Sequence, residues 1–286
     1  MLNKNILISG AGIAGPSVAF WLQKYGFNPV VVEHAPKPRE GGYLVDFRGT
    51  SIKVAEQMGI MDQVREKQYV PKEMLFMNES NEVAARVDIE RMFKETFDDP
   101  SKAQTQILRS DLARLLYDKT KENVEYMFSD SIQSMKEDAE GIDIVFESGK
   151  SRKFDLVIGA DGIHSKVRSL VFGEESQIAH YMGCYQVSFW IDYPTKIGTN
   201  LSFTTPGKFI SLFGFPNNRA MVYAVFRRTE KFTVDHHDTD TQKQLFAEEF
   251  SKFHWKPMPE ILEQAKTVHD FLFDSANLIQ IDKWSK

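Results

Sequence analysis

The sequence predicts an α/β fold in which a Rossmann-like βαβ unit is joined to a mainly antiparallel sheet. Three observations carry this prediction. A short apolar run at residues 5–9 ends at a glycine-rich turn, and a helical pattern at 13–25 and a valine-rich run at 28–33 follow it. Strand, helix and strand within about 30 residues make a parallel βαβ unit. Beyond residue 182, strand-like segments follow one another with turn signals between them, which is typical of an antiparallel sheet.

The first half of the chain continues as alternating helices and short strands. Helical spacing places two sets of side chains inward: Val18, Ala19, Leu22 and Tyr25 in the first helix, and Leu112, Leu115 and Leu116 in a later one. The polar stretch 90–102 is expected to be irregular. The elements predicted after the βαβ unit are a helix at 50–58, a hairpin at 73–78 and 82–88, a helix at 109–121, strands at 124–128, 131–137, 142–147 and 154–160 (the last one buried), and a helix at 165–171.

The second half is predicted to hold the antiparallel sheet. Its expected elements are strands at 183–192, 200–205, 208–215 and 219–228, helices at 239–252 and 258–265, and a final strand at 268–281. The turn Pro216-Asn217-Asn218 joins the third and fourth strands. Alternate residues of a strand face opposite sides, so the phenylalanines of these strands line either the core or a pocket, and the core is favoured for Phe203, Phe213, Phe215 and Phe226.

Charge and composition exclude several classes of partner. The net charge is −5 and the pI is about 5.9, so the chain has no basic excess for nucleic acid or an anionic membrane. No window approaches a membrane span of roughly 20 apolar residues, and no secretory signal is visible, which predicts a cytoplasmic protein. Cys184 is the single cysteine, which excludes an intrachain disulfide. The adjacent pair His236 and His237 is more typical of a solvated loop than of a metal site.

The strongest chemical signal is the motif from Gly10 to Gly15, Gly-Ala-Gly-Ile-Ala-Gly, between the first strand and the first helix. Its three glycines permit a tight turn, close approach of a pyrophosphate and close packing of helix on strand. The helix N-terminus then faces the anionic diphosphate. Glu33 ends the second strand, where a carboxylate accepts hydrogen bonds from ribose hydroxyls. We therefore expect nucleotide contacts at Gly10, Gly12, Ala14, Gly15, Glu33 and His34.

A second motif lies further along the chain. The string from Asp155 to Arg168 places Asp161 and Gly162 between a strand and a helix. It closely resembles the Asp-Gly motif of the FAD-dependent aromatic hydroxylases, the para-hydroxybenzoate-hydroxylase-like monooxygenases. Arg109, at the start of a helix, matches the family arginine that reaches FAD.

The loop Gly41–Gly49 resembles the family loop beside the flavin and makes Asp46 and Arg48 candidates near the ring. The spacing Gly-Gly-x-x-x-Asp in this loop and the Pro-Asn-Asn turn suit the branch that includes the tetracycline-inactivating monooxygenases. Arg39 is left with two interpretations: a contact to a pyrophosphate or nicotinamide dinucleotide, or a solvated loop charge.

The resemblance implies a flavoprotein monooxygenase. NAD(P)H would reduce FAD, and the reduced flavin would use O₂ to hydroxylate a small aromatic or polyketide-like substrate, with a tetracycline as one candidate. The cofactor carries this chemistry, so no catalytic acid–base pair and no metal are expected. The implied domains are an FAD-binding domain at 1–175 with a hairpin insertion near 70–105, a mainly antiparallel substrate domain at 176–270, and a return strand at 271–286.

Two alternatives remain beside the monooxygenase. The first is a flavin-dependent oxidoreductase that inserts no oxygen, because fold does not fix reaction. The second is an inactive fragment. The family carries a third motif, Gly-Asp-Ala-Ala, and the chain stops at Lys283–Lys286, just short of it. On this resemblance the family's C-terminal segment is expected to be missing.

Overall fold

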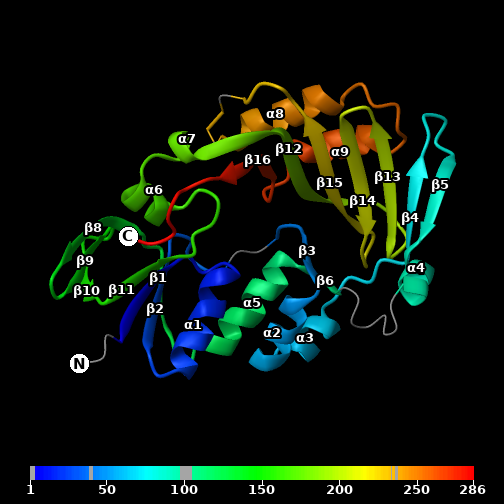
Figure 1. Ribbon diagram of the computed structural model, residues 1–286. Helices are drawn as coiled ribbons and strands as arrows, with labels where there is room; N and C mark the ends of the chain where they lie inside the picture. Colours follow the sequence, from blue (N-terminus) through cyan, green and yellow to red (C-terminus); the bar gives the residue numbers. More distant parts are fainter. Residues whose placement is uncertain (1–3, 39–40, 97–104, 233, 236–237) are drawn as a thin grey trace.

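The computed structural model describes residues 4–38, 41–96, 105–232, 234–235 and 238–286. Figure 1 shows two large sheets one above the other. Within the described residues, the lower sheet has four strands in the order β11-β1-β2-β7. The upper sheet has seven strands in the order β16-β12-β15-β14-β13-β4-β5. This mixture of a parallel and a largely antiparallel sheet confirms the predicted fold class.

The lower sheet is built on the predicted βαβ unit. Its strands are β1 (Asn5–Ser9), β2 (Asn28–Glu33), β7 (Glu125–Phe128) and β11 (Leu156–Gly159), and helix α1 (Ala14–Lys24) connects the first two. Every pairing among them is parallel. Parallel strands need both faces covered, which explains their continuous apolar runs. β11 was expected to be buried throughout, but Leu156 is 47% exposed because this strand lies at the edge of the sheet.

Alternate side chains of the lower sheet enter two separate cores. Leu7, Val30 and Val32 pack against a small antiparallel sheet, and Ile6 and Ile8 belong to the cluster on the α1 side. The small sheet consists of β8 (Ile132–Asp138), β9 (Gly141–Phe146) and β10 (Ser151–Phe154). Helix α5 (Arg109–Thr120) lies beside α1 on the opposite side (Figure 1). The βαβ unit is thus fixed between two layers.

A short ribbon next to α5 was absent from the sequence prediction. It pairs β3 (Leu44–Phe47) with β6 (Thr105–Leu108) in antiparallel register. Helices α2 (Thr50–Met58) and α3 (Met61–Glu66) cover it, and their buried side chains form one cluster with Phe47 and Ile107. α2 has its predicted bounds, whereas α3 was not predicted. The ribbon matters for function because it carries the loop 41–49 to the start of α5.

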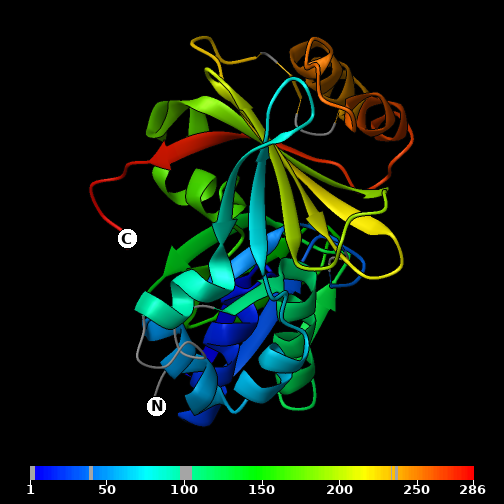
Figure 2. The ribbon, with the colours of Figure 1, turned by 90° about the vertical axis from the view of Figure 1, so that its right-hand side faces the viewer.

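The upper sheet contains more strands than the antiparallel sheet that the sequence predicted. Its antiparallel strands are β12 (Ala179–Asp192), β13 (Thr199–Thr205), β14 (Lys208–Gly214), β15 (Arg219–Arg227) and β16 (Leu272–Ile279). The predicted hairpin forms as β4 (Glu73–Met77) and β5 (Val83–Asp88), and β4 pairs in parallel with β13. Figure 2 shows this hairpin, in cyan, along the edge of the upper sheet. The hairpin expected within the first domain therefore extends the second sheet.

Helices α8 (Thr239–Phe250) and α9 (Met258–Ala265) cover one face of the upper sheet (Figure 1). Phe189, Phe226, Phe246 and Phe250 are at most 1% exposed in the cluster between them. Complete burial of such a side chain stabilises the fold by about 1.5–3 kcal/mol. The core interpretation is therefore correct for Phe226, as it is for Phe203 in the same cluster.

The opposite face of the upper sheet carries buried polar side chains beside apolar ones such as Trp190 and Met221. Ser188, Ser202 and Ser211 alternate with the core residues and are at most 3% exposed. Ser202 and Ser211 hydrogen-bond to each other at 2.9 Å, and Tyr69 donates to Asn200 Oδ1 at 2.7 Å. Burial raises the pKa of the Tyr69 hydroxyl well above its usual range. This face is the one turned toward the lower half of the molecule.

Two further predictions were wrong. Part of the stretch expected to be irregular forms helix α4 (Ile89–Thr96), where Arg91 pairs with Glu95 and Lys94 with Glu90 at i,i+4 spacing. Tyr25, expected to face inward, is 72% exposed because α1 ends at Lys24 and Tyr25 lies just past it.

Candidate functional site

The glycine motif forms the turn between β1 and α1, and two of its glycines are required by packing. Gly10 has φ +105°, and a Cβ there would lie 2.5 Å from the carbonyl oxygen of Ala160. A Cβ on Gly15 would lie 1.9 Å from the carbonyl oxygen of Gly10. Both contacts are with backbone atoms that cannot move aside cheaply. The turn therefore closes tightly against β11 and α1.

Gly12 has a different environment. The nearest atom that a Cβ there would meet is Nη2 of Arg109, at 3.5 Å. The surface of the loop at Gly12 is therefore open except for that guanidinium. Arg109 begins α5, and its backbone N–H donates to the Tyr43 carbonyl at 2.9 Å. Within the described ranges its side chain has no ion pair and no hydrogen bond, so a half-buried positive charge stands next to the loop without a carboxylate partner.

The N-terminus of α1 lies at the same place. Its N-cap is Ile13, no side chain accepts a hydrogen bond from its first amides, and its first turn contains no acidic residue. The amides of a first helical turn need acceptors from outside the helix, and the helix dipole favours an anion there. Ala14 is the first residue of this helix and is exposed. Gly12, the start of α1 and Arg109 together can hold a diphosphate.

Glu33 lies at the end of β2, and both of its carboxylate oxygens accept hydrogen bonds. The backbone N–H groups of Ala11 and Ala35 donate to the carboxylate at 2.7 and 3.0 Å, and Nδ1 of His34 lies 2.9 Å from Oε1. Burial would raise the pKa of Glu33, but the hydrogen bonds from His34, Ala11 and Ala35 outweigh it and lower the pKa to about 2. Glu33 thus holds the glycine turn directly through the Ala11 N–H.

Asp161 is also engaged with the chain itself. Its Oδ1 accepts from the Ser165 hydroxyl at 2.5 Å, and its Oδ2 accepts from the Val167 N–H at 3.1 Å and from the Ser9 hydroxyl at 3.3 Å. The carboxylate therefore ties the end of β1 to the start of α6 (Lys166–Phe172). Gly162 follows with φ +86°, and nothing lies within 4 Å of its missing Cβ.

The two candidates on the loop 41–49 contact each other. Nη2 of Arg48 lies 3.7 Å from Oδ2 of Asp46, and Gln106 on β6 donates to Oδ1 at 2.8 Å. Their exposed fractions are 71% for the Arg48 side chain and 34% for that of Asp46. The structure thus puts them on the outer part of the β3–β6 ribbon. Arg39, the remaining candidate, lies outside the described residues.

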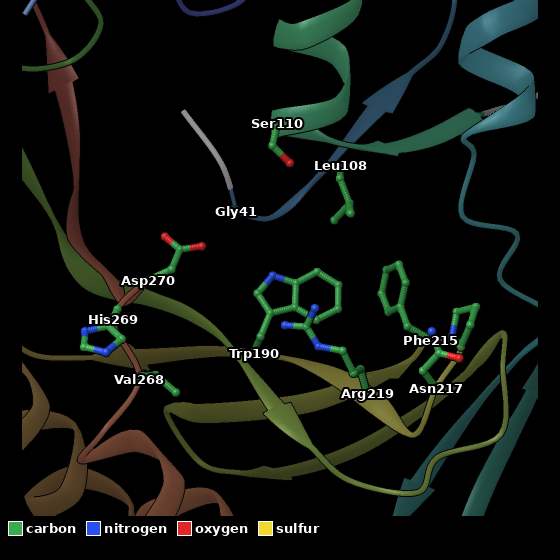
Figure 3. A pocket seen from close by; sticks show the side chains of 11 residues that line it. Gly41, Leu108, Ser110, Trp190, Phe215, Asn217, Arg219, Val268, His269 and Asp270 are labelled. Atoms are coloured by element: carbon green, nitrogen blue, oxygen red, sulfur yellow. The ribbon is translucent and has the colours of Figure 1, made fainter. Parts of the chain in front are cut away.

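A cavity of about 700 Å³ lies between the two halves of the molecule. Figure 3 shows its side chains: Leu108 and Ser110 come from the β6–α5 junction, and Trp190 and Arg219 come from the upper sheet. The complete lining is Gly41, Leu108, Ser110, Trp190, Phe215, Pro216, Asn217, Arg219, Val268, His269 and Asp270. The cavity is therefore bordered by Gly41 and by the two residues on either side of Arg109 in the chain.

Sequence reasoning found few of these lining residues. Phe215 was considered for a pocket but assigned to the core, whereas it is half-buried. It stacks on Tyr69 and meets Trp190 edge to face, with ring centroids 4.7 Å apart in each pair. Asn217 was identified only as part of a turn. Residues 268–270 were expected to begin the last strand, but that strand begins at Leu272. The available signal was the cluster of aromatic and polar residues at the ends of β12 and β15.

One more cluster joins the Asp-Gly loop to the upper sheet. His164 Nδ1 lies 3.0 Å from Oε1 of Glu175 on α7 (Glu175–Ile178), and its Nε2 lies 3.5 Å from Oδ1 of Asp274 on β16. The hydrogen bond with Asp274, opposed by partial burial and aided by the charge of Glu175, raises the pKa of His164. Arg168 also reaches Glu175, at 3.4 Å.

Comparison with known proteins agrees with this geometry. The family model for an FAD binding domain matches residues 3–270. A flavin-dependent monooxygenase of Legionella longbeachae is 33% identical over 289 residues, covering 99% of this chain and 72% of that protein. No helix in the described ranges is both long and apolar enough to cross a membrane.

Solved structures give the same assignment. The tetracycline destructase Tet(51) superposes with a TM-score of 0.85 at 29% identity, covering 100% of this chain and 72% of that one. The tetracycline destructase Tet(55) gives 0.86 at 27% identity, covering 99% and 71%. The chain therefore belongs to the group A FAD-dependent monooxygenase family and is an FAD-dependent oxidoreductase.

Proposed function

We propose that FAD binds with its diphosphate between Gly12, the start of α1 and Arg109. The observation that carries this proposal is the guanidinium of Arg109, which has no partner within the described ranges and lies 3.5 Å from where a Cβ of Gly12 would be. A buried or half-buried charge without a counterion is costly, and a diphosphate would relieve that cost. Gly10, Ala14 and Gly15 would shape the same turn.

The other predicted residues would act around this point. Glu33 would fix the turn through Ala11 and would accept from the ribose, with His34 holding its carboxylate. Asp161 and Gly162 would form the rim of the cofactor site on the β11–α6 side. Asp46 and Arg48 would lie toward the ring, and Arg39 is a candidate for contact with the pyrophosphate or the nicotinamide donor. We further propose that residues 1–175 form the FAD-binding domain, that 176–270 form the substrate domain, extended by the β4–β5 hairpin, and that 271–286 return to the first.

We propose that the cavity next to Arg109 takes a small aromatic or polyketide-like substrate, and that the reaction is hydroxylation with NAD(P)H and O₂. When bound, FAD supplies the electron transfer and the oxygen activation. The chain's own residues bind and orient the substrate: Trp190 and Phe215 offer flat apolar faces, and Leu108 closes the opposite wall. Two tetracycline destructases at 29% and 27% identity favour a tetracycline as the first substrate to try.

The experiment begins with the visible spectrum of the protein after incubation with FAD and desalting. Flavin bands that remain with the protein are expected. Oxidation of NADH and NADPH is then followed together with O₂ uptake, with and without a tetracycline or a simple phenol. Oxygen uptake matched by hydroxylated product supports the monooxygenase. Oxidation of NAD(P)H with no oxygen in the product would instead indicate a flavin oxidoreductase that inserts none.

A further inference from the structure

His164 joins the Asp-Gly loop of the lower half to the upper sheet. It follows Asp161 and Gly162 in the turn between β11 and α6. Its Nδ1 lies 3.0 and 3.1 Å from the two oxygens of Glu175 on α7, and its Nε2 lies 3.5 Å from Oδ1 of Asp274 on β16. Helix α7 runs directly into β12, so both carboxylates belong to elements of the upper sheet or leading into it (Figure 1).

Only a protonated ring satisfies both carboxylates. A neutral imidazole has one N–H, so its other nitrogen would present a lone pair to a carboxylate, whereas an imidazolium donates from both nitrogens. The carboxylates accordingly raise the pKa of His164: the hydrogen bond with Asp274 acts most strongly, partial burial opposes it, and the charge of Glu175 adds to it. Deprotonation of His164 therefore releases one of the two contacts.

Arg168 connects this cluster to the backbone of the Asp-Gly loop. Its guanidinium donates to the carbonyl oxygen of Gly162 at 3.4 Å and to that of Ile163. The same guanidinium lies 3.4 Å from Oε2 of Glu175, and the Arg168 side chain is only 12% exposed. One carboxylate therefore holds both His164 and the guanidinium that fixes the loop.

The charges of the cluster balance only when His164 is protonated. Glu175 and Asp274 are anionic at neutral pH and Arg168 is cationic, so a neutral ring leaves one carboxylate unpaired. Burial, with a smaller contribution from the charge of Asp274, raises the pKa of Tyr185 on β12, so that phenol stays neutral over the same range. An unpaired carboxylate beside the Asp-Gly loop disfavours an anionic ligand there.

We propose that His164 is a positioning residue for FAD: its imidazolium fixes Gly162 at the rim of the cofactor site, and FAD binds more tightly when the ring is protonated. The inference rests on the proposed function for one point, namely that Asp161 and Gly162 form that rim. By thermodynamic linkage, bound FAD favours the proton on His164 by the same factor. The chain just before β16 lines the cavity, so the cluster also sets the cofactor rim relative to the cavity wall.

The first measurement is the dissociation constant of FAD for the apoprotein, from quenching of flavin fluorescence between about pH 6 and about pH 9. In the parent protein it should rise roughly threefold or more as the pH passes through the raised pKa of His164. In His164→Gln it should be independent of pH, because the amide keeps its donor at every pH. His180→Gln is the matched control and should keep the rise, since His180 is exposed on β12 outside this cluster.

Asp274→Asn is the conservative variant. Its amide fills the same space and can donate to the bare Nε2 of neutral His164. The dissociation constant at high pH should therefore stay close to that of the parent protein at low pH. A second readout follows the His164 ring by NMR in the parent protein, and the ring should titrate at a higher pH when FAD is bound. This readout needs no variant to fold.

The outcomes separate this inference from the proposed function. FAD binding that is independent of pH in the parent protein overturns the inference and leaves the cofactor proposal standing, as does equal titration of His164 with and without FAD. A pH dependence that persists in His164→Gln also overturns it, because the dependence then comes from another group such as His34 beside Glu33. Absence of FAD binding at every pH overturns the cofactor proposal, and the inference falls with it.

Discussion

Two helices begin at the same edge of the parallel sheet, and they begin differently. α1 follows β1, and its N-cap Ile13 offers no side-chain acceptor. α6 follows β11, and Ser165 accepts from the Arg168 N–H at 3.0 Å while Asp161 accepts from the Val167 N–H. The chain thus satisfies the amides of α6 with its own side chains and leaves those of α1 open. The comparison indicates where an anionic ligand would bind, since only the open end lies beside Arg109, whose side chain has no ion pair among the described residues.

The largest expected effect is the difference between two glycines of the α1 turn. Gly15→Ala places a methyl group 1.9 Å from the Gly10 carbonyl oxygen and should destabilise the protein by about 3 kcal/mol or more. Gly12→Ala meets only Nη2 of Arg109 at 3.5 Å, so its free energy of unfolding should change by about 0.5 kcal/mol or less. Urea denaturation measures both changes.

Retention of FAD gives a second test of the difference between Gly12 and Gly15. Gly12→Ala should fold and yet lose FAD on desalting, because its methyl group occupies the space for the diphosphate. Normal FAD retention by this variant would contradict the proposed path of the diphosphate.

At the start of α6, we expect substitution of Asp161 to lower the stability of the protein. Asp161→Ala removes the acceptor for the Val167 N–H and for the Ser9 and Ser165 hydroxyls, which should cost about 2 kcal/mol. Asp111→Ala is the matched control, because Asp111 lies in the first turn of α5 and only approaches Lys67, at 3.9 Å. Equal urea midpoints for the two variants would show that α6 is not held by Asp161.

The α1 turn also predicts a dependence of stability on acid. Hydrogen bonds from His34, Ala11 and Ala35 overcome burial and lower the folded pKa of Glu33 to about 2, below its ordinary value of 4.5. The stabilisation by Glu33 is therefore complete above pH 4.5 and is lost as the pH falls toward 2. The difference in unfolding free energy between the parent protein and Glu33→Gln should shrink across that window. A difference independent of pH would contradict the assigned contacts.

The smallest expected effect is a stabilisation by His164, near α6. It is lost as the pH rises, whereas that by Glu33 is lost as the pH falls. The hydrogen bond with Asp274 and the charge of Glu175 raise the pKa of His164 above its usual 6.5. Its stabilisation is complete below pH 6.5 and is lost as the pH rises through the raised value. His164→Gln should therefore remove a modest decline in thermal midpoint across neutral pH. The decline should persist in His180→Gln, because His180 lies on β12 outside this cluster.

The features of the fold that the sequence predicted are those that depend on short-range patterns. The βαβ unit, the glycine turn and the bounds of α2 and α9 depend on periodicity and turn chemistry within a few residues. The β3–β6 ribbon could not be predicted, since its four-residue strands pair across about 60 positions, as Gln106 with Asp46 illustrates. The i,i+4 ion pairs of α4 were readable and were overlooked.

The residues of the candidate site also fall into a group that the sequence predicted and a group that it did not. Gly12 and Arg109 were identified from motif and resemblance, and the structure brings them together. The cavity was not predictable, because Trp190, Arg219 and Asp270 come from three distant segments and meet only when β12, β15 and the chain before β16 are assembled. No local pattern distinguishes a strand-end arginine over a tryptophan from a solvated charge.

The central claim is tested most directly by the affinity of the apoprotein for FAD in the Arg109→Gln variant. Quenching of flavin fluorescence gives the dissociation constant, and Arg114→Gln on the same helix serves as control, because Arg114 already pairs with Asp118. We predict that Arg109→Gln weakens FAD binding at least about tenfold and that Arg114→Gln leaves it unchanged. Equal FAD affinity in the two variants and the parent protein would contradict the account.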